Sequence, residues 1–173
     1  MSNNIHTFKG VTPSFDDTVF VAPSADVIGD VEIGEGSSIW FNCVVRGDVN
    51  SIRIGKRSNI QDGTVIHVSN GTHPAVIGDD VLVGHNCIIH GCTLEDESFV
   101  GMGATVLDGA VVESGAMVAA GALLTPNKRV PTGELWGGSP AKFLRKLSDE
   151  EVANLTSGAK HYAELAQIYK SGK

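Results

Sequence analysis

The sequence predicts an all-β solenoid, a parallel β-helix that is followed by one C-terminal α-helix. Two columns of residues that recur every six positions indicate the solenoid, and an apolar stripe with helical spacing indicates the helix. Glycine makes up 21 of the 173 residues. That share suits a chain of many short coils, because glycine relieves backbone crowding near turns.

The first column is aliphatic and opens each six-residue unit. Its members are Ile33, Ile39, Val45, Ile54, Ile60, Ile66, Ile77, Val83, Ile89, Leu94, Val100, Val106, Val112, Val118 and Leu124. The second column is mostly small and lies four positions later. Its members are Ser37, Cys43, Ser58, Thr64, Val81, Cys87, Thr93, Ser98, Ala104, Ala110, Ala116 and Ala122. In a triangular coil of three short strands, the aliphatic side chain fills the interior and the small residue points inward near a corner. Coils of this kind stack as parallel ladders ~4.8 Å apart, which predicts about five coils over about residues 21–125.

The six-residue period breaks in three places. The spacing is three residues longer than six over 45–54, five longer over 66–77 and one shorter over 89–94. Extra residues in a solenoid are expected to leave the tube as loops, and such loops often mark the binding side.

The last part of the chain carries the signals of a helix. Ser148 suits the N-cap and Glu151 follows three residues later, which is the capping-box pattern. An apolar stripe follows at three- and four-residue spacing: Val152, Leu155, Ala159, Tyr162, Ala166 and Tyr169. We expect one domain in which residues 1–147 form a lead-in, the β-helix and an irregular exit segment. Residues 148–173 form the helix, which packs on a face of its own or a neighbouring chain.

Composition excludes several classes of protein. With 13 basic and 20 acidic residues, the net charge of −7 argues against a nucleic-acid binder. No apolar run approaches the ~20 residues that span a membrane. The polar start of the chain lacks the order of a signal peptide, so we expect a cytoplasmic protein. Cys43, Cys87 and Cys92 are too few for a disulfide framework and are expected to be small buried residues.

The repeat assigns positions in space to three of the six histidines. His67 and His90, together with Arg46, occupy the second position of units that stack on one face, so the two imidazoles should lie roughly 5 Å apart at the backbone. His85 belongs to the next face, in a column with Asp62. It cannot easily reach the same metal ion within one chain, but a neighbouring prism in a trimer would supply it.

Three histidines without a fourth protein ligand are typical of a catalytic zinc site with an open position. Zinc lowers the pKa of a bound water to ~7 and so provides hydroxide at neutral pH. Gln61 and Asp62 are expected to orient that hydroxide or to fix a histidine tautomer. Arg46 and Asp48 are expected to pair across the subunit contact, since arginine suits planar, bidentate pairing.

Several motifs resemble those of the gamma-class carbonic anhydrases, and the resemblance extends from about Val11 through the C-terminal helix. The motifs are Arg46-Gly47-Asp48, Asn59-Ile60-Gln61-Asp62-Gly63, Ile66-His67, Val83-Gly84-His85, Ile89-His90-Gly91-Cys92 and Gly101-Met102-Gly103-Ala104. The chain is most similar to short bacterial members, some of which have been labelled ferripyochelin-binding protein. The resemblance implies a left-handed β-helix and a homotrimer with zinc, or iron or cobalt, at its subunit interfaces.

By the same resemblance, His67 and His90 of one chain and His85 of the next hold the metal, and the reaction is the reversible hydration of CO2 to bicarbonate. Arg46 and Asp48 match the interface pair of that family, and Gln61 and Asp62 match its active-site polar pair. Tyr162 falls where related proteins have a tyrosine near the site.

Two departures from the family pattern bear on the proton-transfer step. Val49 stands where the prototype enzyme has an acidic residue, and the loop over residues 69–74 lacks the glutamate that is thought to shuttle protons. His73 in that loop is the expected substitute, because its unperturbed pKa of ~6.5 suits proton transfer near neutral pH. We therefore expect weak carbonic anhydrase activity. Two alternatives stay open: a hexapeptide-repeat acyl-CoA thioesterase or transferase, and a metal-binding homologue without turnover.

Overall fold

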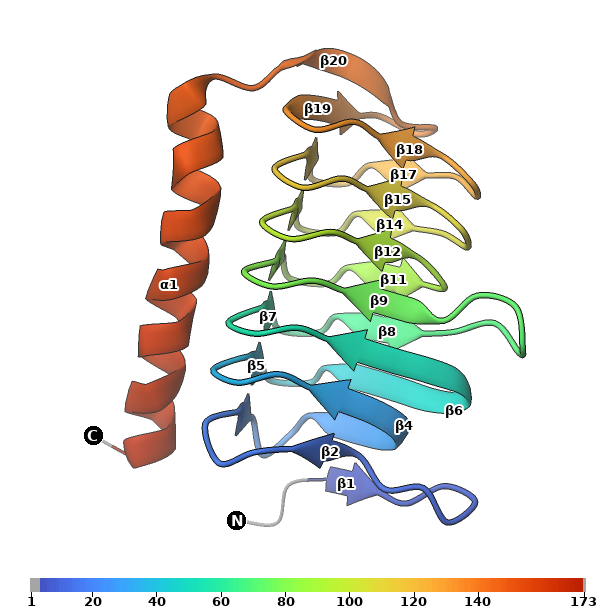
Figure 1. Ribbon diagram of the computed structural model, residues 1–173, viewed down its shortest axis with the longest axis vertical. Helices are drawn as coiled ribbons and strands as arrows, with labels where there is room; N and C mark the ends of the chain where they lie inside the picture. The colour runs from blue at the N-terminus through green and yellow to red at the C-terminus, as the bar shows by residue number, and fades with distance from the viewer. Residues whose placement is uncertain (1–3, 173) are drawn as a thin grey trace.

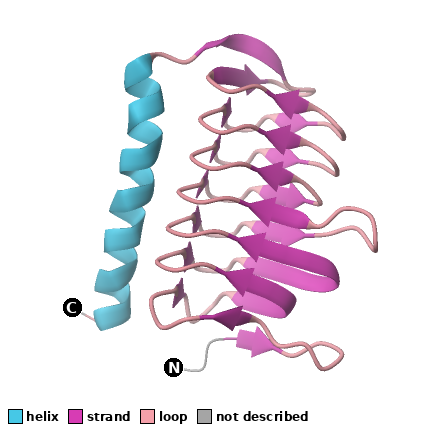
Figure 2. Cartoon of the chain, viewed as in Figure 1, coloured by secondary structure: helices cyan, strands magenta, loops and turns pink. Residues whose placement is uncertain are grey.

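The computed structural model describes residues 4–172, which form a left-handed parallel β-helix with one long helix along its side (Figure 1). Each coil places short strands on three faces and turns at three corners (Figure 2). Residues 1–3 and 173, which the sequence assigns to the lead-in and to the end of the helix, lie outside the described residues. No helix in the described part of the chain is long and apolar enough to cross a membrane.

Three ladders of strands run along the solenoid, one on each face, and we call these faces the histidine face, the second face and the helix face. The histidine face contains β1 (Asn4–His6), the first halves of β4 (Asp26–Ile33) and β6 (Val44–Ile54), β8 (Val65–His67), β11 (Ile88–His90), β14 (Thr105–Val106) and β17 (Leu123–Leu124). The second face contains β2 (Ser14–Phe15), the second halves of β4 and β6, β9 (Ala75–Ile77), β12 (Thr93–Leu94), β15 (Val111–Val112) and β18 (Arg129–Val130). The helix face contains β3 (Phe20–Val21), β5 (Ser38–Ile39), β7 (Asn59–Ile60), β10 (Leu82–Val83), β13 (Phe99–Val100), β16 (Met117–Val118), β19 (Glu134–Gly137) and the antiparallel β20 (Lys142–Lys146).

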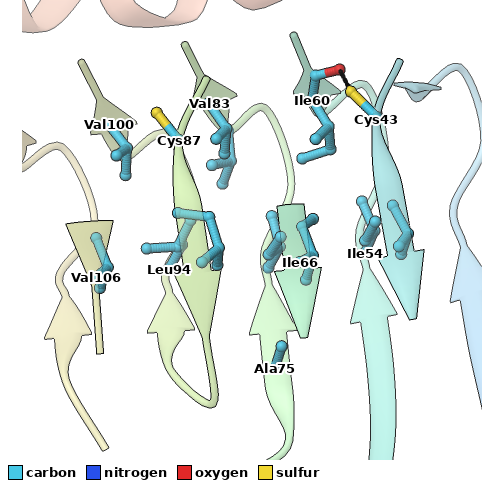
Figure 3. Packing of buried hydrophobic residues seen from close by; sticks show 14 of the residues in the cluster. Cys43, Ile54, Ile60, Ile66, Ala75, Val83, Cys87, Leu94, Val100 and Val106 are labelled. Atoms are coloured by element: carbon cyan, nitrogen blue, oxygen red, sulfur yellow. Dashed lines mark hydrogen bonds between the residues drawn. The ribbon is translucent and has the colours of Figure 1, made fainter. Parts of the chain in front are cut away.

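The interior of the prism is built from the two predicted columns. Every member of the aliphatic column is buried, and successive coils place these side chains one above another (Figure 3). The small column is also confirmed, with one correction. Thr93 lies half-buried on β12, and Cys92 takes the inward corner position, because the coil is one residue short there. All three cysteines are free and buried, as expected.

The solenoid is longer than the repeat predicts. The helix face has seven parallel strands, from β3 to β19, where about five coils were expected. The additional strands extend the ladder at both ends: β3 pairs with β5, and β18 and β19 pair with β15 and β16. Backbone hydrogen bonds hold these coils, and such bonds do not need the six-residue pattern to continue.

The three breaks in the period lie at one corner of the prism, where the histidine face turns into the second face. Of the three breaks, only the one at residues 68–74 forms a projecting loop, and an isolated bridge between Ser69 and His73 closes that loop. The extra residues near Gly47 instead stay within β6, which runs without interruption across both faces beside β4. We call this edge of the prism, formed by residues 47–51, 68–74, 91–92 and 107–110, the irregular corner.

Helix α1 (Asp149–Ser171) begins with the predicted capping box. The Ser148 side chain accepts a hydrogen bond from the Glu151 backbone, and the Glu151 carboxylate accepts one from the Ser148 backbone. Leu155 and two alanines of the stripe are buried against the helix face of the same chain, chiefly over β3, β5, β7 and β10. The sequence left open whether the helix packs on its own chain or on a neighbour, and it packs on its own.

Candidate metal centre

His67 and His90 lie side by side on the histidine face, as the repeat predicts. Strands β8 and β11 pair in parallel register with His67 opposite His90. The ring centroids are 5.1 Å apart, and His67 Nδ1 lies 3.1 Å from His90 Nε2. Both side chains keep some access to solvent, with 20% and 31% of their surfaces exposed. The ladder therefore brings one nitrogen of each ring to a common point at the protein surface.

A carboxylate holds the other nitrogen of each ring. Asp48 Oδ1 lies 3.0 Å from His67 Nε2, and Asp108 Oδ1 lies 2.5 Å from His90 Nδ1. When both carboxylates are ionised, each accepts the N–H of its imidazole. Neutral rings in these tautomers direct their lone pairs, on His67 Nδ1 and His90 Nε2, toward each other. Carboxylate–histidine pairs of this kind orient histidine ligands in metal sites.

Both carboxylates have pKa values below the ordinary range for aspartate. Burial alone raises the pKa of Asp48, but hydrogen bonds from Arg46 and His67 outweigh it. Burial likewise raises the pKa of Asp108, and hydrogen bonds from Ser69 and His90 more than compensate. Asp48 and Asp108 are therefore charged acceptors at neutral pH.

His85 lies at the opposite edge of the histidine face, in the turn that precedes β11. Its Nδ1 is 2.9 Å from Asp62 Oδ2, which confirms the predicted column of these two residues. Within residues 4–172 of one chain, no group of three or more histidine, cysteine or acidic side chains could hold a metal ion. A single chain thus offers a pair of histidines at one edge and one histidine at the other.

Gln61 and Tyr162 lie near Asp62, the partner of His85: Gln61 directly precedes Asp62 after β7, and Tyr162, on helix α1, lies close enough to feel the charge of Asp62. Gln61 is buried, and its Nε2 donates to Asn59 Oδ1 at 3.0 Å, which holds the amide in one orientation. Tyr162 packs edge-on against Trp40, with ring centroids 5.7 Å apart. Burial and, to a smaller extent, the nearby charge of Asp62 raise the pKa of the Tyr162 hydroxyl. Both predicted residues therefore lie on the same side of the prism as Asp62.

His73 lies in the projecting loop, near the His67–His90 pair but not in direct contact with it. Its Nδ1 is 3.1 Å from Thr72 Oγ1 and 4.0 Å from Asp108 Oδ2, and 38% of the side chain is exposed. Asp108 thus separates His73 from His90.

Arg46 and Asp48 pair within the chain, and their expected pairing across a subunit contact stays a prediction. Arg46 Nη1 lies 2.5 Å from Asp48 Oδ2 while Asp48 Oδ1 faces His67. The two residues are only two positions apart along β6, so their side chains project from the same side of the strand. One arginine therefore supports the carboxylate that holds His67.

The spacing of the histidine pair fits a zinc ion. Two nitrogens bound tetrahedrally at ~2.05 Å from zinc lie about 3.3 Å from each other, close to the observed separation. Two facing lone pairs repel unless a proton or a cation lies between them. The pair therefore supplies two nitrogen donors with suitable spacing, and His85 Nε2, which faces away from Asp62, supplies a third donor on another edge.

Exposed apolar side chains surround both parts of the site. Val65 and Ile88 lie two residues before His67 and His90 on the same strands, so their side chains point outward beside the histidines. Met102 occupies the turn one coil after His85 and is also exposed. Apolar surface next to polar ligands is typical of a face that another protein chain covers.

Three supporting residues escaped the sequence-based prediction. Asp108 and Ser69 hold His90, and Asn59 holds Gln61. Asn59 stands within a motif that the sequence singled out, so its position two residues before Gln61 was an available signal. Asp108 is 18 residues from His90, and the one-residue deletion near Gly91 hides the register between them.

Comparisons with known proteins agree with this architecture. The family model described as hexapeptide repeat of succinyl-transferase matches residues 74–108 and 93–126. The chain is 60% identical to gamma carbonic anhydrase 2, mitochondrial, of Arabidopsis thaliana over 92% of its own length, but it spans only 59% of that relative. It is 48% identical to a probable carbonic anhydrase of Methanocaldococcus jannaschii, with 90% and 97% of the two chains covered. The crystal structure of a hexapeptide transferase family protein from Anaplasma phagocytophilum is 49% identical, with a TM-score of 0.93 over 98% of this chain and 99% of that one.

Proposed function

The chain belongs to the gamma carbonic anhydrase family, and from this premise we propose that it catalyses the reversible hydration of CO2 to bicarbonate at a metal centre shared between copies of the chain. The observation that carries the proposal is the His67–His90 pair. Two imidazole nitrogens face each other at 3.1 Å, and a carboxylate holds the far nitrogen of each ring.

In the proposed centre, His67 Nδ1 and His90 Nε2 of one chain and His85 Nε2 of a neighbouring chain hold zinc, with iron and cobalt as the other candidate metals. A bound zinc ion supplies a Lewis acid that makes water available as a nucleophile near neutral pH. The separation of the histidines on two edges of one prism supports a homotrimer, because a closed ring of three chains sets one edge of each chain against a face of the next. The exposed apolar residues beside both edges support the same arrangement.

The surrounding polar residues have separate roles in the proposed site. Asp62 holds His85 Nδ1 and thereby leaves Nε2 without a proton. In this proposal the Gln61 amide, which a hydrogen bond to Asn59 holds, orients the reacting oxygen, and the Tyr162 hydroxyl stays protonated and able to donate. His73 carries the proton from the site to solvent. These assignments follow the sequence-based predictions for the four residues and stay proposals, as does the cytoplasmic location.

Complementation between inactive chains tests the shared centre. When His85→Ala and His90→Ala chains are co-expressed, about one interface in four should combine an intact histidine pair with an intact His85 in a random trimer. Zinc content and CO2 hydration, measured by stopped flow, should recover to about that share. The matched control combines His67→Ala with His90→Ala and should recover nothing, because both ligands must come from the same chain. Equal recovery in the two mixtures would contradict a two-chain site.

A second candidate function is acyl transfer from coenzyme A or hydrolysis of its thioesters. The observation in its favour is the name of the Anaplasma structure, a hexapeptide transferase family protein. Cleavage of coenzyme A thioesters without CO2 hydration would select this function. Zinc binding without either activity would select a metal-binding protein without turnover.

Removal of the metal by a chelator should abolish CO2 hydration by the proposed centre, and added zinc should restore it.

A further inference from the structure

We propose that Asp108 is a positioning residue of this centre, which keeps the proton of His90 on Nδ1 and directs the bare Nε2 toward His67. The inference rests on the proposed function only in that the positioned nitrogen is offered to a metal ion. The role was not predicted from the sequence, because Asp108 lies in the turn after β14, one coil beyond His90.

The Asp108 carboxylate is held by groups from two other coils. Its Oδ1 lies 2.5 Å from His90 Nδ1, and Ser69 Oγ donates to its Oδ2 at 2.6 Å. Ser69 belongs to the loop that follows β8, the strand that carries His67. The carboxylate therefore links the turn after β14 to both histidine-bearing coils, and neither of its oxygens is left to rotate away from the imidazole.

The shortened coil at Gly91 makes room for this carboxylate. Gly91 has a positive φ of 53°, and a Cβ added there would lie 2.4 Å from Asp108 Oδ1 and 2.8 Å from His73 Cβ. Any side chain at this position would displace the carboxylate or the loop. The missing residue and the glycine thus act together to bring a carboxylate from the next coil against His90.

An aspartate at another corner offers a natural comparison. Asp96 lies above Gly78 in the same way, with its Oδ1 2.3 Å from where a Cβ of Gly78 would be. Its Oδ1, however, accepts from the backbone N–H of Asp79 at 2.8 Å, which closes an ordinary turn. At the irregular corner the equivalent carboxylate contacts an imidazole. An aspartate packed over a glycine therefore accepts a hydrogen bond from the backbone at one corner and contacts a candidate metal ligand at the other.

Nitrogen NMR of the metal-free protein tests the inference without relying on activity. At pH about 8.5, where an ordinary imidazole is neutral, long-range proton–nitrogen spectra distinguish the two tautomers of each histidine. We expect His90 to carry its proton on Nδ1 in the native chain and to lose that preference in Asp108→Ala. Asp108→Asn retains a neutral acceptor and should show an intermediate population. Asp96→Ala is the matched control and should leave the His90 tautomer unchanged.

Zinc affinity, measured by competition with a chromogenic chelator, provides the second readout. Asp108→Ala should weaken zinc binding about 10- to 100-fold, with smaller losses for Asp108→Asn and for Ser69→Ala and none for Asp96→Ala. The inference is overturned if His90 of the native chain carries its proton on Nε2. It is also overturned if Asp108→Ala changes neither the His90 tautomer nor the zinc affinity. If Asp108 controls the tautomer but no variant or native chain binds zinc, the proposed function fails while the positioning role stands. If the native chain binds zinc but the His90 tautomer is the same with and without Asp108, the positioning role fails while the proposed function stands.

Discussion

The two edges of the histidine face hold their histidines in different ways. At the irregular corner, His67 and His90 are stacked by a backbone ladder, and each ring has its own carboxylate, Asp48 or Asp108. At the other edge, His85 stands alone in a turn with one partner, Asp62, close to the packed helix α1. The first edge is a preformed two-nitrogen site, and the second is a single donor that needs a counterpart. The difference teaches that local folding prepares one edge more fully than the other, and in the proposed two-chain centre assembly would complete the site.

The largest expected effect comes from removing single ligands. His90→Ala and His85→Ala should each lower CO2 hydration by at least about a thousandfold, because the metal loses one of three protein ligands. The two variants should nevertheless differ in residual zinc affinity, since His85→Ala keeps the preformed pair. Equilibrium dialysis against zinc measures this difference. Equal residual affinities would show that the pair is no better a site than the lone histidine.

A charge placed beside the histidine pair should separate the copies of the chain. Ile88 is 46% exposed, so Ile88→Glu should leave the isolated chain folded, but it would bury an unpaired carboxylate in the proposed interface. We expect a shift from trimer to monomer and a loss of activity of more than tenfold or so. Light scattering gives the mass. Val76→Glu is the control, because Val76 is 40% exposed on the second face, and it should leave assembly intact.

Asp62→Asn should weaken the second edge alone. Loss of the carboxylate frees the His85 ring to adopt the wrong tautomer, so we expect activity to fall about 10- to 100-fold. Kinetic measurements at saturating zinc separate this effect from metal loss. Asp26→Asn is the matched control, because Asp26 forms a similar pair with His6 at 2.9 Å outside the site. A fall in activity in both variants would point to a general effect on the fold.

The smallest effect concerns the start of helix α1 in acid. The hydrogen bond and charge of Arg145, with the Ser148 backbone, lower the pKa of Glu151 from 4.5 to about 2. A carboxyl group whose pKa is lower in the folded than in the unfolded chain stabilises the fold at pH values above its unfolded pKa of 4.5, and this contribution is lost as the pH falls through the folded pKa of about 2. Hydrogen exchange over residues 149–155 should therefore accelerate as the pH is lowered from 4.5 to about 2. Glu151→Gln should remove the pH dependence, whereas Glu150→Gln should retain it.

The sequence predicted those features that the repeat itself encodes. The inward aliphatic column and the His67–His90 column follow from the six-residue repeat, and the Ser148 cap follows from the separate capping-box pattern; the structure confirms all three. The coils beyond the repeat were missed because backbone pairing continues where the side-chain pattern stops. Thr93 was misplaced because a deletion shifts the register by one residue within a coil.

The supporting contacts of the site were harder to predict. Asp108 lies 18 residues after His90, which equals three six-residue units, but the coil between them is one residue short, so the ladder sets Val106, 17 residues on, opposite Ile89 and leaves Asp108 in the following turn. Arg46 and Asp48 pair along one strand, while the same two residue types suit an interface equally well from sequence alone. Such contacts depend on side-chain rotamers, which periodicity does not specify.

The backbone ladder fixes how far apart His67 and His90 are attached to the prism. Main-chain hydrogen bonds between neighbouring coils set the backbone distance between the two histidines, so the pair adapts to ions of different radius only through rotation of the two rings. In the proposed two-chain centre the third donor comes from a second copy, so preference for one metal over another would depend mainly on how closely and at what angle that copy docks. In such a protein, evolution can retune metal choice by altering surface packing while the two stacked rings stay untouched.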